Sequence, residues 1–283
     1  LSIRRQRQMC IRDSGCDPRK GDGYKMKFLR MLCVQLRQML SWKLFVYGAV
    51  FALVQTGGAL GFMTRDEFTS VWYIVYLGTT TGMSFLTLYI LPTLLFSMSL
   101  QQDWENHATP YWTVRAGVSN YTVAKLLTGA AAGFLTVGIG LLLWIFALRA
   151  AQYPWFVDAV GDTGYEAALL NGSIFAGFAG YILHYALSGA VIGMFGMFIT
   201  VFIQNAYAGV AAPLSLHLTL SRLLSNTPTS PTSVWHLNNW VVSIHTAPTA
   251  GQTLLEKLLL TLLLCTVMCI AAAEHMKRRM EHA

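Results

Sequence analysis

Residues 97–125 read SMSLQQDWENHATPYWTVRAGVSNYTVAK and separate two long apolar runs. The chain is only 12% charged, yet this stretch holds four charged residues: Asp103, Glu105, Arg115 and Lys125. It also carries four amphipathic aromatic residues: Trp104, Tyr111, Trp112 and Tyr121. Such side chains are enriched where a membrane meets water. The pattern predicts an interfacial segment at one membrane face, and an ordinary connecting loop is the alternative interpretation.

The composition of the whole chain indicates a membrane protein. Of its 283 residues, 54% are hydrophobic and 12% are charged, whereas soluble domains carry roughly 25% charged residues. Several apolar runs have the length of about 20 residues that a helix needs to cross a bilayer. The net charge of +7 is attributed to membrane orientation. We therefore expect an all-α polytopic membrane protein whose surroundings are the lipid bilayer, with no nucleic-acid partner.

Six apolar runs predict six transmembrane helices, at about residues 44–63, 71–100, 126–148, 172–203, 206–224 and 254–273. Pro92 is expected to kink the second of them, because proline removes a backbone donor and clashes one turn back. Glycine pairs four residues apart predict faces for close helix packing. These pairs are Gly57 and Gly61, Gly78 and Gly82, Gly129 and Gly133, and Gly189 and Gly193.

A basic amphipathic helix is predicted before the first span. Residues 26–43 place apolar side chains at helical spacing, with Lys27, Arg30 and Arg37 between them. A helix of this kind lies on a membrane surface. The alternative is that the segment simply extends the first span.

Residues 1–24 are interpreted as a non-native tail. They begin without Met, are rich in Arg and lack the apolar core of a signal peptide. They resemble translated sequencing-adapter read-through. The membrane domain is then residues 25–283, with Met26 as a natural start.

The distribution of Lys and Arg predicts the orientation, because six spans place both termini on one side. On the terminus side lie ten cations: Lys25, Lys27, Arg30, Arg37, Lys43, Arg115, Lys125, Lys277, Arg278 and Arg279. On the opposite side lie four: Arg65, Arg149, Arg222 and Lys257. The positive-inside rule therefore predicts that both termini and residues 97–125 are cytoplasmic.

The sequence contains no recognisable catalytic constellation. It has no HExxH, no GxSxG and no nucleotide-binding Gly-Lys loop. We expect no enzyme activity, no metal site and no cofactor in this chain. Two histidines inside predicted spans, His184 and His217, are candidates for a proton or substrate site. The alternative for both is an interhelical hydrogen bond.

The order of these parts resembles the transmembrane permease subunits of ABC-2 type ABC transporters. In that family an amphipathic helix precedes six spans, and a long exterior connection precedes the last. Residues 101–125 are similar to the family's cytoplasmic coupling segment, which has an acidic residue, a basic residue and a Lys that opens span three. In this chain these residues are Glu105, Arg115 and Lys125.

The resemblance implies an exporter in a bacterial cytoplasmic membrane, with ATP and Mg²⁺ bound by a separate ATPase subunit and with a second permease copy or paralogue. By analogy, Glu105 and Arg115 would form ion pairs with the ATPase, and Lys125 would cap the cytoplasmic end of span three. The interfacial anchors would be Trp104, Tyr111 and Trp112. An amphiphilic or apolar cargo is expected, because no charged residue stands out along a pathway.

Two other classes of function stay open on the sequence alone. One is a proton-coupled secondary transporter that uses His184 and His217. The other is a non-transporting membrane scaffold or immunity protein. The first predicts pH-dependent transport without ATP, and a neighbouring ATPase gene would argue against the second.

Overall fold

The computed structural model describes residues 20–64, 66–80, 86–96, 98–160, 164–203, 205–224, 239, 244 and 247–282. Every regular element bounded within these residues is a helix, which confirms the all-α class. The helices are α2 (Lys20–Met39), α3 (Trp42–Ala59), η1 (Leu60–Phe62), α4 (Val71–Thr80), α5 (Thr87–Leu94), α6 (Met98–Glu105), α7 (Ala108–Ala116), α8 (Val118–Ala150), α9 (Gly164–Leu170), α10 (Ile174–Ile203), α11 (Ala206–Leu224) and α13 (Ala250–His282).

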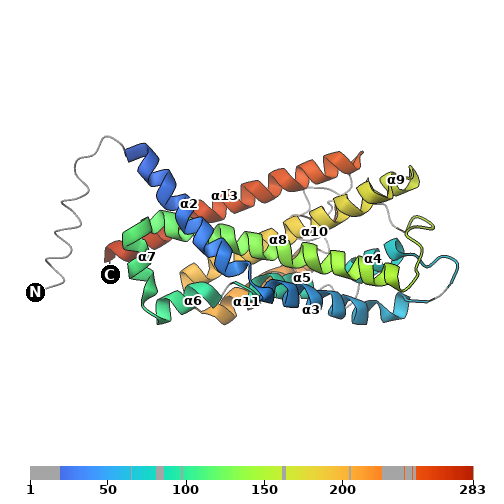
Figure 1. Ribbon diagram of the computed structural model, residues 1–283, viewed down its shortest axis with the longest axis horizontal. Coiled ribbons are helices and arrows are strands. Elements are labelled where there is room, and N and C mark those ends of the chain that lie inside the picture. Colours follow the sequence, from blue (N-terminus) through green and yellow to red (C-terminus); the bar gives the residue numbers. More distant parts are fainter. Residues whose placement is uncertain are drawn as a thin grey trace, which may run out of the picture.

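Four helices are long and apolar enough to cross a membrane: Trp42–Phe62, Val118–Ala150, Ile174–Ile203 and Ala250–Glu281. They correspond to the first, third, fourth and sixth predicted spans. Figure 1 shows them running along the long axis of the molecule. The helix α8 has 33 residues, so its length is about 50 Å at 1.5 Å per residue. The chain thus has the helices of a membrane protein.

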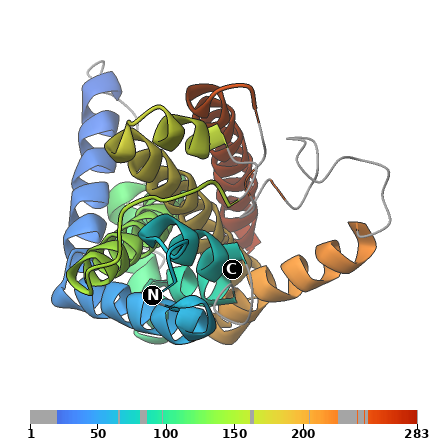
Figure 2. The same ribbon diagram turned by 90° about the vertical axis from the view of Figure 1, so that its right-hand side faces the viewer.

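The other two predicted spans are not confirmed as spans. Residues 71–100 contain α4, α5 and the start of α6, and Pro92 lies inside α5. The first two of these helices have 10 and 8 residues, fewer than the roughly 20 needed to cross a bilayer. The apolar part of α11 is shorter too, at Tyr207–Leu220. Figure 2, seen along the long axis, shows α11 extending sideways from the bundle.

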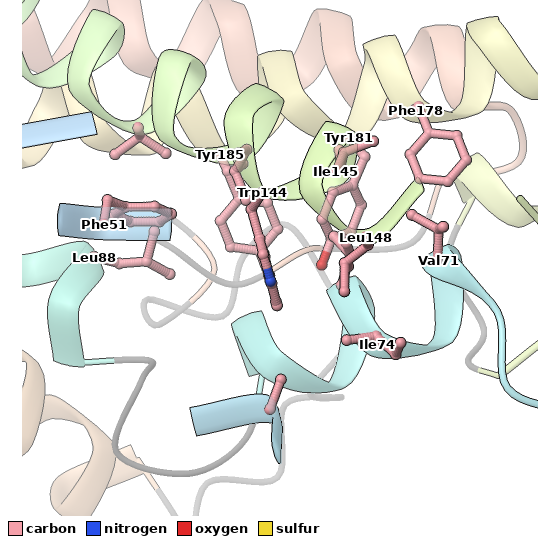
Figure 3. Packing of buried hydrophobic residues seen from close by; sticks show 14 of the residues in the cluster. Phe51, Val71, Ile74, Leu88, Trp144, Ile145, Leu148, Phe178, Tyr181 and Tyr185 are labelled. Carbon is pink, nitrogen blue, oxygen red and sulfur yellow. The ribbon is translucent and has the colours of Figure 1, made fainter. Parts of the chain in front are cut away.

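The centre of the molecule is α8, which packs most extensively against α10 and also against α3. One buried cluster lies toward α4 and α9 and is rich in aromatic rings. Figure 3 shows Trp144 of α8 among side chains from α3, α4, α5 and α10, including Phe51, Ile74, Leu88 and Tyr185. A second cluster lies toward α2, α6 and α7 and includes several methionines.

The packing of α8 on α10 depends on the glycine pairs at which the sequence predicts close helix contact. A Cβ atom on Gly189 would lie 2.6 Å from the carbonyl oxygen of Gly133, and one on Gly193 would lie 2.5 Å from that of Gly129. The two backbones are therefore in direct contact. By contrast, Cβ atoms on Gly57 and Gly61 would meet nothing within 4 Å. The packing face predicted for the first span therefore makes no close contact among the described residues of this chain.

Among the other predicted pairs, Gly78 also lies at a close contact, since its Cβ would be 2.5 Å from the ring of Trp144. Its predicted companion, Gly82, lies outside the described residues.

The predicted amphipathic segment forms α2, which crosses α8 obliquely in Figure 1. The helix ends at Met39, and the bend at residues 40–41 separates it from α3, so it is not a continuous extension of the first span. Met31, Gln35 and Met39 are four residues apart and buried on one face. The helix begins at Lys20 and so includes the last residues of the stretch interpreted as a tail.

Candidate functional site

Two short helices, α6 and α7, form a hairpin at one end of the bundle (Figure 1). Helices of eight and nine residues are not stable alone in water, so the hairpin depends on its packing. His107 forms the turn in a left-handed conformation, with φ of 53°. Pro110 is accommodated in the first turn of α7, where no intrahelical donor is lost. Gly117 ends α7 with φ of 88°, a conformation that favours glycine.

A buried ion pair attaches this hairpin to α8. Lys125 Nζ lies 2.9 Å from Asp103 Oδ2, and the two side chains are 2% and 21% exposed. The hydroxyl of Tyr121 donates to the same carboxylate oxygen at 2.7 Å. Lys125 Nζ also lies 5.2 Å from the centre of the Phe96 ring. A carboxylate from α6 thus compensates a cation inside α8, and a charge that far from water is costly without such a partner.

The three predicted coupling residues fall in different environments. Glu105 is exposed at the end of α6 and accepts a hydrogen bond from Gln101 Nε2 at 2.6 Å. Arg115 is exposed in the last turn of α7, with its guanidinium 4.0 Å from the centre of the Tyr111 ring. Lys125 is buried in the pair with Asp103. Only Glu105 and Arg115 are on the surface in this structure.

The three predicted interfacial anchors are also divided. Tyr111 is half exposed. Trp104 and Trp112 instead pack partly against the buried cluster of this end. Arg279 of α13 places its guanidinium 5.0 Å from the centre of the Trp104 ring. Trp104 therefore joins α6 to the end of α13.

Charge differs between the two ends of the molecule. Cations predominate at the α6–α7 end among the described side chains of α2, α6, α7 and the last turns of α13. The cations there are Lys27, Arg30, Arg37, Arg115, Lys277, Arg278 and Arg279, and the carboxylates are Asp103, Glu105, Glu274 and Glu281. At the opposite end the described side chains of the loops and α9 are mainly acidic: Asp66, Glu67, Asp158 and Glu166, beside Arg149 of α8.

The two histidines of the predicted spans are each hydrogen-bonded to a tyrosine of another helix. His184 is fully buried on α10, with Nδ1 3.0 Å from the hydroxyl of Tyr165 on α9. Burial, with a contribution from Tyr185, raises the pKa of Tyr165 above its ordinary value, so the phenol stays protonated. His217 is half-buried on α11, with Nδ1 2.7 Å from the hydroxyl of Tyr89. These bonds are the interhelical kind that the alternative interpretation predicted.

A second buried carboxylate lies at the opposite end of the molecule. Glu166 Oε1 accepts hydrogen bonds from Trp72 Nε1 at 2.7 Å and from the backbone N–H of Val160 at 3.0 Å. The centre of the Trp72 ring lies 4.9 Å from that of Tyr181, whose hydroxyl is hydrogen-bonded to the hydroxyl of Thr79. These contacts join α4, α9 and α10, which indicates a structural role for Glu166.

Sequence reasoning missed two of these arrangements. Asp103 was only one of four charged residues in its stretch, although Tyr121 and Lys125 are four residues apart and so share a helix face. The sequence signal that could have predicted this ion pair was a lysine, Lys125, at the start of a predicted span with a carboxylate, Asp103, in the polar segment before it. The pairing of Trp72 with Glu166 had no local signal, because 94 residues separate them.

The described residues hold no group of three or more His, Cys, Asp or Glu side chains that could bind a metal ion. No protein-family model, curated protein or solved structure matches this chain.

Proposed function

We propose that the chain is the transmembrane permease subunit of an ABC-2 type exporter. It would move an amphiphilic or apolar substrate across a bacterial cytoplasmic membrane and would work with a separate ATPase subunit and a second permease copy or paralogue. In this proposal α4 with α5, and α11, provide the second and fifth crossings, and both termini are cytoplasmic.

The observation that carries the proposal is the α6–α7 hairpin. It lies between the second and third predicted spans, at the basic end of the bundle, and the pair of Asp103 with Lys125 ties it to α8. Its turn presents Glu105, Asn106 and His107, which are all exposed. A rigidly attached, exposed hairpin suits the transmission of movement from a cytoplasmic ATPase to a membrane helix.

Two further features support the same orientation. The excess of Lys and Arg at the α6–α7 end agrees with the positive-inside rule if that end is cytoplasmic. The oblique, basic helix α2 leaves Leu29 and Val34 exposed, as in a helix that lies at a membrane surface.

The test is co-purification from the native membrane. The tagged full chain is isolated, and a captured ATPase is identified by mass spectrometry through its phosphate-binding loop. Glu105→Ala and Arg115→Ala are expected to reduce the captured ATPase several-fold, since an exposed interfacial ion pair contributes up to about 1 kcal/mol. Glu67→Ala, which removes an exposed carboxylate at the opposite end, and Arg37→Ala, which removes an exposed cation from α2, are the matched controls.

Capture of an ATPase that is lost with Glu105→Ala and kept with Glu67→Ala would support the hairpin as the contact surface. A purified chain that brings no ATPase would overturn the exporter proposal. Equal loss in the controls would leave no role for the hairpin.

The two histidines that are hydrogen-bonded to tyrosines favour a second candidate function, a proton-coupled secondary transporter. His184 is hydrogen-bonded to the hydroxyl of Tyr165, and His217 stacks on Tyr89 with ring centres 4.3 Å apart. Histidine can take up and release a proton near neutral pH. This candidate requires substrate flux driven by a pH gradient without ATP, measured in vesicles, and it requires that His184→Ala abolish that flux.

A further inference from the structure

A surface cavity of about 380 Å³ lies between α2 and α7, and the last two residues of α7, Arg115 and Ala116, are part of its wall. The helix α2 contributes Lys27, Arg30, Met31 and Val34 to its wall. The helix α7 contributes Trp112, Arg115 and Ala116. The cavity is therefore built by two segments that are about 80 residues apart in the sequence and that meet only in the folded chain.

The cavity combines three cations with an apolar floor. Lys27, Arg30 and Arg115 are exposed, and no carboxylate is among the described residues that line it. Met31 is only 4% exposed, and Trp112 is half-buried. The stacking of Arg115 on Tyr111 holds one guanidinium in place before any ligand arrives. Such a site suits a ligand that has an anionic group and an aliphatic part.

The cavity lies at the depth of the lipid headgroups if the long apolar helices span the bilayer. The roughly 50 Å length of α8 matches or exceeds the 40–45 Å of a bilayer with its headgroups, so its first turn lies in the headgroup layer. A single residue, Gly117, separates the end of α7 from the start of α8. Beside the cavity, Leu29 and Val114 expose 56% and 73% of their surfaces, and such side chains are stabilised in contact with acyl chains.

We propose that this cavity binds the phosphate group of an anionic phospholipid. The forked guanidinium groups of Arg30 and Arg115 suit bidentate contact with phosphate oxygens, and Lys27 adds a third positive charge. The acyl chain lies along Met31, Val34 and Trp112. Basic pockets beside membrane helices are suited to anionic headgroups by this chemistry. The inference does not depend on an ATPase partner.

The experiment measures lipid binding to the purified, delipidated full chain by native mass spectrometry and by the thermal shift that added lipid produces. The probes are phosphatidylglycerol, which is anionic, phosphatidylcholine, which is zwitterionic, and inorganic phosphate. The test variant is Lys27→Gln with Arg30→Gln. The matched control, Arg37→Gln with Lys43→Gln, removes the same charge from exposed positions outside the cavity.

Phosphatidylglycerol is expected to bind and to raise the unfolding temperature, whereas phosphatidylcholine and inorganic phosphate have little effect. Each cavity cation lost is expected to weaken phosphatidylglycerol binding about fivefold, so the test variant loses on the order of 25-fold and the control much less. Arg115→Gln alone loses about fivefold, and Arg30→Lys, which keeps the charge but not the fork, weakens binding less than Arg30→Gln does.

Three results would overturn the proposal. Equal loss in the control variant would mean a diffuse attraction of the basic surface. Equal binding of phosphatidylcholine would exclude recognition of net charge. Equal stabilisation by inorganic phosphate, lost in the test variant, would mean that the site takes a free phosphate and not a lipid. Retained helix content and a monodisperse elution profile show that the variants are folded.

Discussion

Lys125 illustrates how one buried charge constrains its surroundings. Its side chain on α8 is only 2% exposed, and its partner Asp103 comes from another helix. An isolated charge so far from water would cost several kcal/mol. The carboxylate of Asp103, with the Tyr121 hydroxyl on the same oxygen, compensates this cost and selects one docking geometry for the hairpin.

We therefore predict that Asp103→Asn destabilises the folded chain by about 3 kcal/mol, because it leaves the buried Lys125 cation without a counter-charge. Thermal unfolding of the purified protein in detergent measures the change. Replacing both partners, as Asp103→Leu with Lys125→Met, is expected to recover most of the loss, since no charge then stays buried.

The control for this prediction is Glu105→Gln, which removes an exposed carboxylate two residues away. It should change the stability by less than about 0.5 kcal/mol. Similar losses for Asp103→Asn and Glu105→Gln would contradict a special role for the buried pair.

The two residues that flank α7 both have positive φ, but one is a histidine and the other a glycine. Substitutions at the two positions are therefore expected to change the stability in opposite directions. Gly117→Ala is expected to destabilise by about 1–3 kcal/mol, since φ of 88° strains a residue with a side chain. His107→Gly, at φ of 53°, is expected to be neutral or to stabilise by up to about 1 kcal/mol. The same thermal assay measures both, and changes of the same sign would contradict the backbone explanation.

The α8–α10 seam shows how two helices use glycine to approach each other. A Cβ atom on Gly133 would overlap the carbonyl oxygen of Gly189. Because rigid backbone faces the added atom, neither helix can yield locally. The contact is therefore a constraint on the axis-to-axis distance of the two helices.

We predict that Gly133→Ala separates α8 from α10 and destabilises the chain by about 1–3 kcal/mol through overpacking. Gly57→Ala is the matched control, because its Cβ meets nothing within 4 Å. That substitution should stabilise by about 0.5–1 kcal/mol, through the helix propensity of alanine alone. Equal effects of the two changes on the unfolding temperature would contradict the close contact.

The segment of residues 71–100 shows what an apolar pattern along the chain does not reveal. Its apolar content predicts one span, and its described residues include α4 and α5 before α6, with residues 81–85 between them outside the described residues. Buried polar contacts hold these pieces, among them Trp72 with Glu166 and Tyr89 with His217. Hydropathy alone does not reveal these contacts, because the partners lie 94 and 128 residues apart in the sequence.

For the molecule as a whole, the length of α8 and the separation of charge predict that its two ends face opposite sides of a membrane. Asn106→Cys and Glu67→Cys place single thiols at exposed positions of the two ends. In a background whose five native cysteines are replaced by alanine, an impermeant maleimide added to intact cells should label only Cys at position 67. Labelling at both positions, or at 106 alone, would contradict the orientation.

The sequence by itself determined the class of this protein. Four helices with the expected apolar length follow directly from composition, because the cost of placing polar groups in hydrocarbon is local and additive along the chain. The packing face of the glycine pairs on α8 and α10 could also be predicted, since residues four apart lie on one helix face. The helical character of residues 26–39 followed from periodicity.

The tertiary structure alone decided which groups meet. Whether Gly57 packs or stays open, whether Lys125 is on the surface or paired with Asp103, and whether Arg115 shares a cavity with Lys27 and Arg30 all depend on contacts between distant segments. The residue types of one segment do not determine which distant segment it contacts. Each is set by the simultaneous packing of several helices, in which burying a charge or a backbone contact on one helix requires its complement on another.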